Sequence, residues 1–329
     1  MVEKNNDLYR EEIEWSNTWI AKANHSCRRC LLIGDSTTRG IRPKLEIMAW
    51  DLMAVDIFAA SYAIEDVWFW KSLECFLETV NIQYDLIILH YGFHHGFGKH
   101  CYSNEKDWQT FYGFYNKLVQ LVKKYSQNFI IMTGTSEHQK ENINLVWEER
   151  ENEIRTRNNI AKKVAENNKI KVFDLYQLMK TEGQVYAHRD VQHFELPANS
   201  FIAYKLILFI VNQFEGLYEE SKQVKKRLLE KFVFSNRRIM IYGNGNDGNC
   251  IYWFCKYLGI AERIDCYLAI TNEGNSSCGI PIRKIESISE QEKKEVFVIV
   301  ETDDAVNRCD NLNNFGFEKW CVYSQIFNI

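Results

Sequence analysis

The ten residues LLIGDSTTRG, numbered 31 to 40, decide the fold of the first part of the chain. Three apolar residues and a glycine predict a buried strand ending at Gly34, and the residues after it predict the start of a helix. Such a junction needs a side-chain oxygen that accepts hydrogen bonds from the first helical N–H groups, and Asp35 and Ser36 each offer one. This stretch alone fits two roles for Ser36, a nucleophile or a helix cap, and partners elsewhere in the chain must decide between them.

The composition of the 329-residue chain is that of a globular protein of about two domains, with 46% hydrophobic and 26% charged residues. A net charge of −4 argues against a nucleic-acid-binding protein, which would carry a strongly basic face. The first residues are charged, and no window reaches about 18 consecutive apolar residues, so we expect neither a secretory signal nor a membrane span. Ten cysteines without an export signal predict free thiols and a cytoplasmic protein.

Two groups contain cysteines or histidines, which commonly bind metals, but their spacing does not complete a metal site. Cys27 and Cys30 have the spacing of half a zinc knuckle or of a redox pair, but no second pair of cysteines accompanies them. Four histidines lie within eleven residues, and their spacing matches no metal signature: His90, His94, His95 and His100. We therefore expect no metal site.

Short β-rich runs alternate with longer helical runs over the first two thirds of the chain. We expect strands at Cys30–Gly34, Met53–Ala59, Asp85–His90, Phe129–Gly134 and Ile170–Phe173. Helices are expected at Asp66–Val80, Asp107–Tyr125, Trp147–Asn167 and about Pro197–Phe214. Alternation of this kind predicts a parallel sheet covered by helices on both faces.

Partners for Ser36 are expected where parallel strands end, because functional groups of open parallel sheets gather at the carboxyl ends of the strands. The third strand is followed by Gly92, His94 and His95, which reach the same rim. Asp190 and His193 stand three residues apart, just before the last helix of this part. Ser36, His193 and Asp190 would supply a nucleophile, a general base and a carboxylate that orients the base.

Gly34-Asp35-Ser36 followed late in the chain by Asp190-Val191-Gln192-His193 resembles the SGNH, or GDSL-type, hydrolases over roughly residues 29 to 214. The resemblance implies a flavodoxin-like three-layer α/β/α fold with a parallel sheet. It also implies ester chemistry, with Ser36, His193 and Asp190 as the catalytic residues. This late match favours the nucleophile over the cap for Ser36.

The oxyanion hole implied by this resemblance departs from the family pattern at two positions. The main-chain N–H of Ser36 is the first expected donor. The family glycine after the second strand is absent, so a main-chain N–H near Ser61 or Tyr62 is expected in its place. Gly92-Phe93-His94-His95 stands where the family has Gly-x-Asn-Asp, so Gly92 and His94 complete the expected hole, with His94 in place of the asparagine.

A charged helix over residues 218 to 231 predicts a connector to a second α/β unit. Further strands are expected at Ile264–Ile270, Glu295–Val300 and Lys319–Val322. Gly243, Gly245 and Gly248 follow the strand RIMIY and open a helix, which is the setting of a loop that binds nucleotide phosphates. The next strand ends in Thr271 and Asn272, without the acidic residue that holds the ribose of NAD.

Residues 237 to 325 resemble the small Rossmann-like domains of bacterial sugar-modifying and polysaccharide-biosynthesis proteins, including a hairpin at NSSCGIPI. The resemblance implies a nucleotide or nucleotide-sugar site at Gly243, Gly245 and Gly248. The alternative is a degenerate Rossmann-like unit that serves assembly or partner docking.

These observations predict an α/β protein with an extension at 1–28, an SGNH-like domain at 29–216, a connecting helix at 217–236 and a smaller Rossmann-like domain at 237–329. We expect a serine esterase that removes or transfers a small acyl group, acetyl above all, on a carbohydrate or glycoconjugate without a required cofactor. The main alternative is a weak or inactive module that binds a nucleotide or sugar in polysaccharide biosynthesis. A nicotinamide-dependent oxidoreductase ranks last, because the ribose-binding acid is missing.

Overall fold

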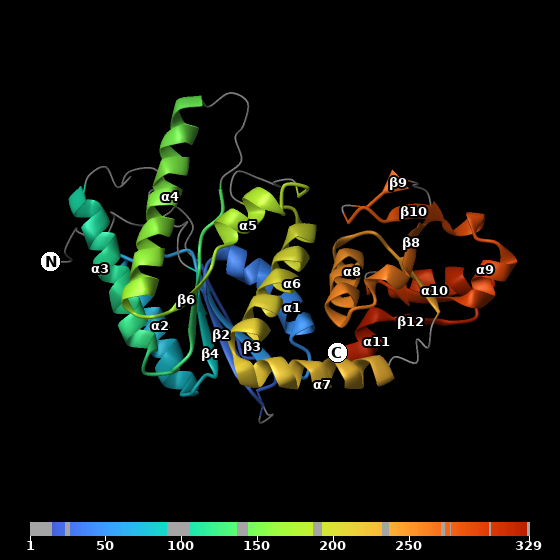
Figure 1. Ribbon diagram of the computed structural model, residues 1–329, viewed down its shortest axis with the longest axis horizontal. Helices are drawn as coiled ribbons and strands as arrows, with labels where there is room; N and C mark the ends of the chain where they lie inside the picture. The colour runs from blue at the N-terminus through green and yellow to red at the C-terminus, as the bar shows by residue number, and fades with distance from the viewer. Residues whose placement is uncertain are drawn as a thin grey trace. The chain divides into compact units, whose positions relative to one another are not determined.

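The computed structural model describes residues 15–23, 27–90, 105–136, 144–186, 193–231, 237–270, 274–276, 278–302 and 304–327. Contacts divide the chain into two compact units. Unit 1 comprises Met1–Glu46 and Met53–Phe194, and unit 2 comprises Ile47–Leu52 and Glu195–Ile329. Each unit contains its own sheet of six strands (Figure 1). The domain limits expected from the sequence at residues 28, 216 and 236 stay predictions.

The sheet of unit 1 has the strand order β1-β3-β2-β4-β5-β6. Its strands are β1 (Ser16–Trp19), β2 (Arg29–Gly34), β3 (Ala54–Ala60), β4 (Leu86–Leu89), β5 (Phe129–Met132) and β6 (Lys171–Phe173). The strands from β2 to β6 are mutually parallel, and β1 pairs antiparallel with β3. Without β1, the order is that of flavodoxin-like folds, in which the first strand of the chain lies between the second and the third. The predicted fold class is therefore confirmed.

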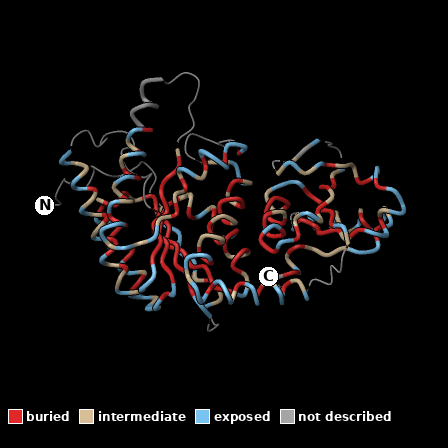
Figure 2. The backbone as a smooth tube through the Cα atoms, viewed as in Figure 1, coloured by how far each residue is buried: buried red, intermediate tan, exposed pale blue. Residues whose placement is uncertain are grey.

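The central strands of this sheet are buried along their whole length, as the red segments in Figure 2 show. Near-continuous apolar runs of this kind are expected where helices cover both faces of a parallel sheet. Helices α2 (Val67–Val80), α3 (Glu105–Val122) and α4 (Asn144–Asn167) cover one face. Helices α1 (Ser36–Met48) and α5 (Leu175–Thr181) lie on the other (Figure 1). The core under α2, α3 and α4 includes Leu31, Phe58, Ile87, Tyr115 and Val164.

Strand β1 was not predicted from the sequence. Its four residues, SNTW, are all exposed, so they carry no alternating apolar pattern. Long-range pairing forms the strand, because Ser16 to Trp19 lie opposite Ala60 to Ile57 of β3. The Arg42 guanidinium also lies over the ring of Trp19, 5.3 Å from its centroid. Strand β1 thereby closes one edge of the sheet.

The sheet of unit 2 has the strand order β12-β11-β7-β8-β10-β9. Its strands are β7 (Arg238–Tyr242), β8 (Ile264–Ala269), β9 (Gly274–Asn275), β10 (Pro281–Lys284), β11 (Val296–Val300) and β12 (Trp320–Val322). All are parallel except β9, which forms the expected hairpin with β10. Strand β7 lies between β8 and β11, which is the arrangement of a Rossmann-type half.

Within the described residues, unit 2 contains six α-helices: α6 (Leu196–Gln213), α7 (Glu215–Lys231), α8 (Asn246–Leu258), α9 (Glu290–Glu295), α10 (Ala305–Asn314) and α11 (Tyr323–Phe327). Helix α6 packs against α8 within unit 2. Trp253 of α8 stacks on Tyr204 of α6 with ring centroids 5.0 Å apart, and it also contacts Phe201 at 5.1 Å. An aromatic cluster therefore joins the two helices.

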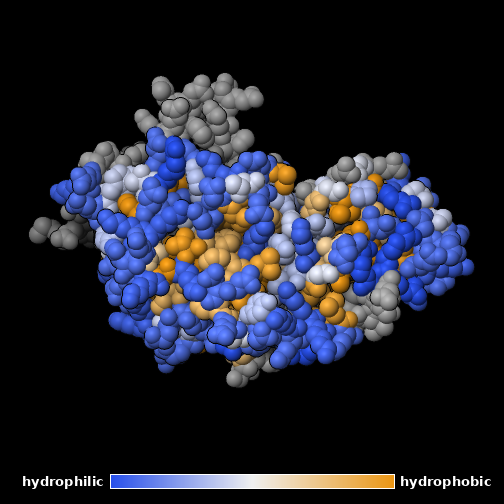
Figure 3. All heavy atoms as spheres, in the orientation of Figure 1, coloured by the Kyte–Doolittle hydropathy of each residue, from blue (hydrophilic) through white to orange (hydrophobic). Residues whose placement is uncertain are grey.

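Hydrophilic residues cover much of the face shown in Figure 3, and hydrophobic residues form patches among them. Within the described ranges, none of the helices combines the length and apolar character that crossing a bilayer requires.

Candidate active site

The turn after β2 sets the position of Ser36. Strand β2 ends at Gly34, and α1 begins at Ser36. Asp35 caps this helix: its Oδ1 accepts a hydrogen bond of 2.9 Å from the N–H of Thr37, and its carbonyl oxygen accepts one of 3.0 Å from the N–H of Arg39. Asp35 therefore supplies the cap, and the hydroxyl of Ser36 is available for another role.

Gly34 is required by the close packing of this turn. A Cβ atom at Gly34 would lie 2.5 Å from the carbonyl oxygen of His90 and 2.0 Å from Thr38 Oγ1. Real Cβ atoms do not approach main-chain oxygens so closely, so any larger residue would push β2 and β4 apart or displace α1. The glycine of the Gly-Asp-Ser sequence thus permits α1 to start directly above the sheet.

The structure brings Ser36 and His193 into direct contact. The distance between Ser36 Oγ and His193 Nε2 is 2.7 Å, across 157 positions of sequence. His193 precedes α6 in the chain, and both side chains are partly exposed. A hydroxyl that touches an imidazole nitrogen and remains accessible has the geometry of an activated nucleophile.

The contact also has a defined chemical direction. In the tautomer that carries its proton on Nδ1, His193 offers an unprotonated Nε2 that accepts a hydrogen bond from the Ser36 hydroxyl. That nitrogen is then placed to receive the serine proton as Oγ forms a bond to carbon. Ser36 follows β2 at the switch point between β2 and β4, where ligands of open parallel sheets bind.

A buried pair lies next to the turn. His90 follows β4, and its Nε2 is 3.6 Å from Asp35 Oδ1. Its Nδ1 lies 3.2 Å from the carbonyl oxygen of Met132 at the end of β5. His90 is 0% exposed and Asp35 is 2% exposed. Asp35, which caps α1, therefore lies beside His90 at the end of β4, and His90 in turn contacts the end of β5.

The main-chain N–H of Ser36 is a candidate oxyanion donor. Ser36 is the first residue of α1, and the N–H groups of the first helical turn have no acceptor within the helix. The helix dipole also favours negative charge at this end. An oxyanion forming beside Ser36 Oγ would lie close to that N–H.

Ser61, expected from the sequence to contribute an oxyanion N–H, is engaged elsewhere. Its N–H donates to the carbonyl oxygen of Trp15 at 3.0 Å, and its Oγ accepts from the N–H of Trp15 at 2.8 Å. These bonds continue the pairing of β1 with β3, which the sequence analysis missed. The expectation for Ser61 was therefore wrong, because an antiparallel partner strand uses the N–H.

Three other predicted site residues lie outside the described residues, so the structure places none of them: Asp190, Gly92 and His94. Their assigned roles stay predictions.

Cys27 is exposed and Cys30 is buried, and both are free thiols. Burial raises the pKa of the Cys30 thiol well above its usual value, with the charges of Asp56 and Asp85 acting in the same direction. An inert structural cysteine fits this setting. Within the described ranges, no group of three or more histidine, cysteine or acidic side chains is arranged to hold a metal ion.

The structure places Gly243, Gly245 and Gly248 at the start of α8, as the sequence predicts. A residue that the sequence analysis did not single out lies against them. Glu301 follows β11, and its Oε1 accepts hydrogen bonds from the N–H groups of Asp247 at 3.0 Å and Gly248 at 3.2 Å. The signal in the sequence was an acid at the end of the apolar run VFVIV.

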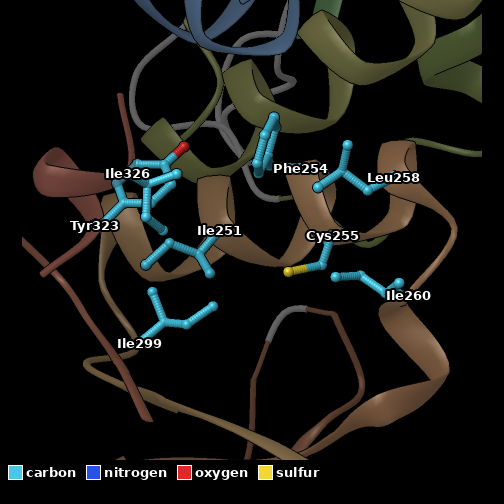
Figure 4. Close-up of a pocket in the computed structure, with 8 residues that line it drawn as sticks. All are labelled: Ile251, Phe254, Cys255, Leu258, Ile260, Ile299, Tyr323 and Ile326. Carbon is cyan, nitrogen blue, oxygen red and sulfur yellow. The ribbon is translucent and has the colours of Figure 1, made fainter. Parts of the chain in front are cut away.

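A small apolar pocket lies on another part of unit 2, between α8, β11 and α11 (Figure 4). It is lined by Ile251, Phe254, Cys255, Leu258, Ile260, Ile299, Tyr323 and Ile326. Burial raises the pKa of Cys255 to about 12, so its thiol stays protonated at neutral pH. The lining offers no charged group to fix a polar ligand, and the pocket is best described as imperfect core packing.

No family model matches the chain, and no curated protein sequence matches it. Solved structures to which the chain is similar include the acetyl xylan esterase AlAXEase, at 20% identity and a TM-score of 0.43, with 55% of this chain and 99% of that chain covered. The α/β hydrolase LAE5 from the metagenome of Lake Arreo, Spain, has 11% identity and a TM-score of 0.43, with 56% and 95% covered. The acetylxylan esterase Axe2 from Geobacillus stearothermophilus has 14% identity and a TM-score of 0.40, with 54% and 91% covered.

Proposed function

We propose that the protein is a serine ester hydrolase, with Ser36 as its nucleophile and His193 as its general base. The observation that carries this proposal is the 2.7 Å distance between Ser36 Oγ and His193 Nε2. A serine hydroxyl is a weak nucleophile, and a base in direct contact activates it. The division of tasks in the turn adds support, because Asp35 caps α1 and leaves the Ser36 hydroxyl facing the imidazole.

In the proposed reaction, Ser36 Oγ attacks the carbonyl carbon of an ester while His193 Nε2 takes the hydroxyl proton. Collapse of the tetrahedral intermediate breaks the bond to the alcohol oxygen, and His193 returns its proton to the leaving alcohol. Water then attacks the acyl-Ser36 ester with the same nitrogen as base, which releases the carboxylic acid and restores Ser36. The Ser36 N–H, with Gly92 and His94, is proposed to hold the oxyanion, and Asp190 to orient His193.

The proposed substrate is a small acyl ester, an acetyl group in the first instance, on a carbohydrate or glycoconjugate. This part rests on the sequence resemblance of residues 237 to 325 to domains of sugar-modifying proteins. A sugar hydroxyl in place of water would make the same site an acyltransferase, so the products distinguish the two reactions.

The test compares wild type, Ser36→Ala and the control Ser72→Ala, which removes a hydroxyl from α2 of the same unit. We expect wild type and Ser72→Ala to hydrolyse p-nitrophenyl acetate and to gain the mass of one fluorophosphonate adduct. We expect Ser36→Ala to do neither. Peptide mapping of the adduct to Ser36 would support the proposal. Absence of turnover and adduct in the folded wild type would contradict it and favour the binding-module alternative.

A further inference from the structure

The Rossmann-like topology of unit 2 implies a bound dinucleotide or nucleotide sugar, whose diphosphate normally lies at the N-terminus of the helix after the first strand. In unit 2 that position is the start of α8, directly after Gly243, Gly245 and Gly248. The fit of a diphosphate depends on whether the main-chain N–H groups there are open to an anion.

An anion of the protein itself already occupies the position. Glu301 Oε1 accepts hydrogen bonds from the N–H groups of Asp247 and Gly248, and the Glu301 side chain is almost fully buried. Glu301 follows β11, the strand beside β7, so it enters from the switch point of the sheet. The carboxylate therefore makes the contacts that a phosphate would make.

Arg308 holds Glu301 in this place. Its Nη1 lies 2.6 Å from Glu301 Oε2 and donates a further bond of 3.0 Å to the carbonyl oxygen of Tyr242 at the end of β7. The main-chain N–H of Glu301 donates to the same carbonyl at 3.0 Å. A charge pair with these additional bonds satisfies both oxygens of the buried carboxylate.

Glu301 and Arg308 occupy the space beside two of the glycines, Gly243 and Gly245. A Cβ atom at Gly243, where φ is +114°, would lie 2.0 Å from Glu301 Oε2 and 1.9 Å from Arg308 Nη1. A Cβ atom at Gly245 would lie 2.7 Å from Glu301 Oε1. In nucleotide-binding loops such glycines let a phosphate approach the main chain. Here they let Glu301 and Arg308 approach it.

We propose that Glu301 is the resident anion of the glycine loop and closes unit 2 to the diphosphates of dinucleotides and nucleotide sugars. A diphosphate would have to displace a buried carboxylate from two N–H groups and from Arg308, or lie beside it with like charges in contact. The N–H groups of Asp247 and Gly248 are hydrogen-bonded within the protein. The glycine pattern therefore indicates close packing of protein side chains and not a phosphate site. This inference does not depend on the proposed ester hydrolysis.

The test titrates the full-length protein with inorganic pyrophosphate and with NAD⁺ by calorimetry. Hydrogen exchange at Asp247 and Gly248 is followed in parallel. Wild type is compared with Glu301→Ala and with the control Glu286→Ala, which removes an exposed carboxylate from the same unit. We expect no saturable binding to wild type or Glu286→Ala, and slow exchange of the two amides in both. Glu301→Ala should lose that protection, bind pyrophosphate at least about tenfold more tightly than wild type and regain protection with it.

Saturable binding of NAD⁺ or pyrophosphate to wild type, with added protection at Asp247 and Gly248, would overturn the proposal. A folded Glu301→Ala variant with wild-type amide exchange and no pyrophosphate binding would also overturn it. If Glu301→Ala fails to fold while wild type binds neither probe, the result supports a structural anion at this position. The wild-type titration therefore keeps the proposal testable even if the variant does not fold.

Discussion

Asp35 Oδ1 lies 3.6 Å from His90 Nε2, in the buried layer next to the turn that carries Ser36. The other ring nitrogen of His90 faces the Met132 carbonyl oxygen, which only accepts hydrogen bonds, so Nδ1 carries a proton. The Asp35 carboxylate therefore lies against an imidazole ring whose other nitrogen contacts the end of β5.

The Asp35–His90 pair predicts that loss of the Asp35 charge lowers the stability of the fold even when the helix cap is kept. Asp35→Asn keeps an oxygen for the Thr37 N–H but removes the charge that faces His90. We expect the free energy of unfolding to fall by about 2 kcal/mol, the range for a buried hydrogen bond to a charged group. Urea unfolding at neutral pH measures it. In a double-mutant cycle with His90→Gln, the coupling should reach about 1 kcal/mol, and strictly additive effects would contradict the pair.

His193 should contribute to the rate and not to folding. We expect His193→Ala to lower kcat/KM for p-nitrophenyl acetate by about a thousandfold, since general-base catalysis typically contributes 10² to 10⁴. Labelling by a fluorophosphonate should slow in parallel, because both reactions need the Ser36 proton removed. Glu195→Ala is the matched control, since Glu195 is exposed and makes no side-chain capping bond at α6. A loss of less than tenfold in His193→Ala would contradict the assigned base.

Replacing glycine by alanine should have opposite effects on the free energy of unfolding at Gly34 and at Gly113. Gly34→Ala places a Cβ atom against the His90 carbonyl oxygen, so we expect a loss of about 1–3 kcal/mol in unfolding free energy and reduced esterase activity. Gly113 lies exposed within α3, where a Cβ atom meets nothing within 4 Å. Gly113→Ala should raise the unfolding free energy by about 0.5–1 kcal/mol. Denaturant unfolding of both variants checks the pair, and equal effects would contradict the packing described for Gly34.

Glu292 predicts a stability change that depends on pH. Hydrogen bonds from the Arg283 guanidinium and then from the N–H of Ser289 lower the pKa of Glu292 to about 2. Since the folded pKa lies below the unfolded value of about 4.3, the carboxylate stabilises the fold above pH 4.3, and this contribution is lost as the pH falls toward 2.

Glu292→Gln should therefore lower the unfolding free energy at pH 7 by up to about 1 kcal/mol, a modest value because the ion pair with Arg283 is partly exposed. The difference from wild type should shrink between pH 5 and pH 3 in urea unfolding. Glu286→Gln, at an exposed position of the same unit, is the control and should show little change. A difference that stays constant with pH would contradict the assigned cause.

The sequence predicts the buried strands well because each is a compact apolar run. The run around Leu31 becomes β2, and the runs around Ile57 and Ile131 become β3 and β5, each within two residues of the expected ends. Their order in a parallel sheet follows from alternation with helices. The contact of Ser36 with His193 was also anticipated, because strand ends and the residues before the last helix share one rim.

The features missed from the sequence all depend on contacts between distant residues. Strand β1 exists because it pairs with β3, and its own residues are exposed. The Ser61 N–H donates to the Trp15 carbonyl oxygen next to this pairing, so it is not open to an oxyanion. The residues around Ser61 in the sequence do not reveal that acceptor. Glu301 reaches the glycine loop from a strand more than fifty residues later, and no spacing rule connects an acid at that distance with a phosphate loop.

The pairing of β1 with β3 has a consequence for self-association. Strand β3 is a buried strand of seven residues, AVDIFAA, and β1 pairs with the outer row of main-chain N–H and C=O groups over Ile57–Ala60. A chain shortened to begin at Arg28 would leave that row open as a template for a strand from another molecule. The exposed segment from Ser16 to Trp19 thus protects β3 from pairing edge to edge with another molecule.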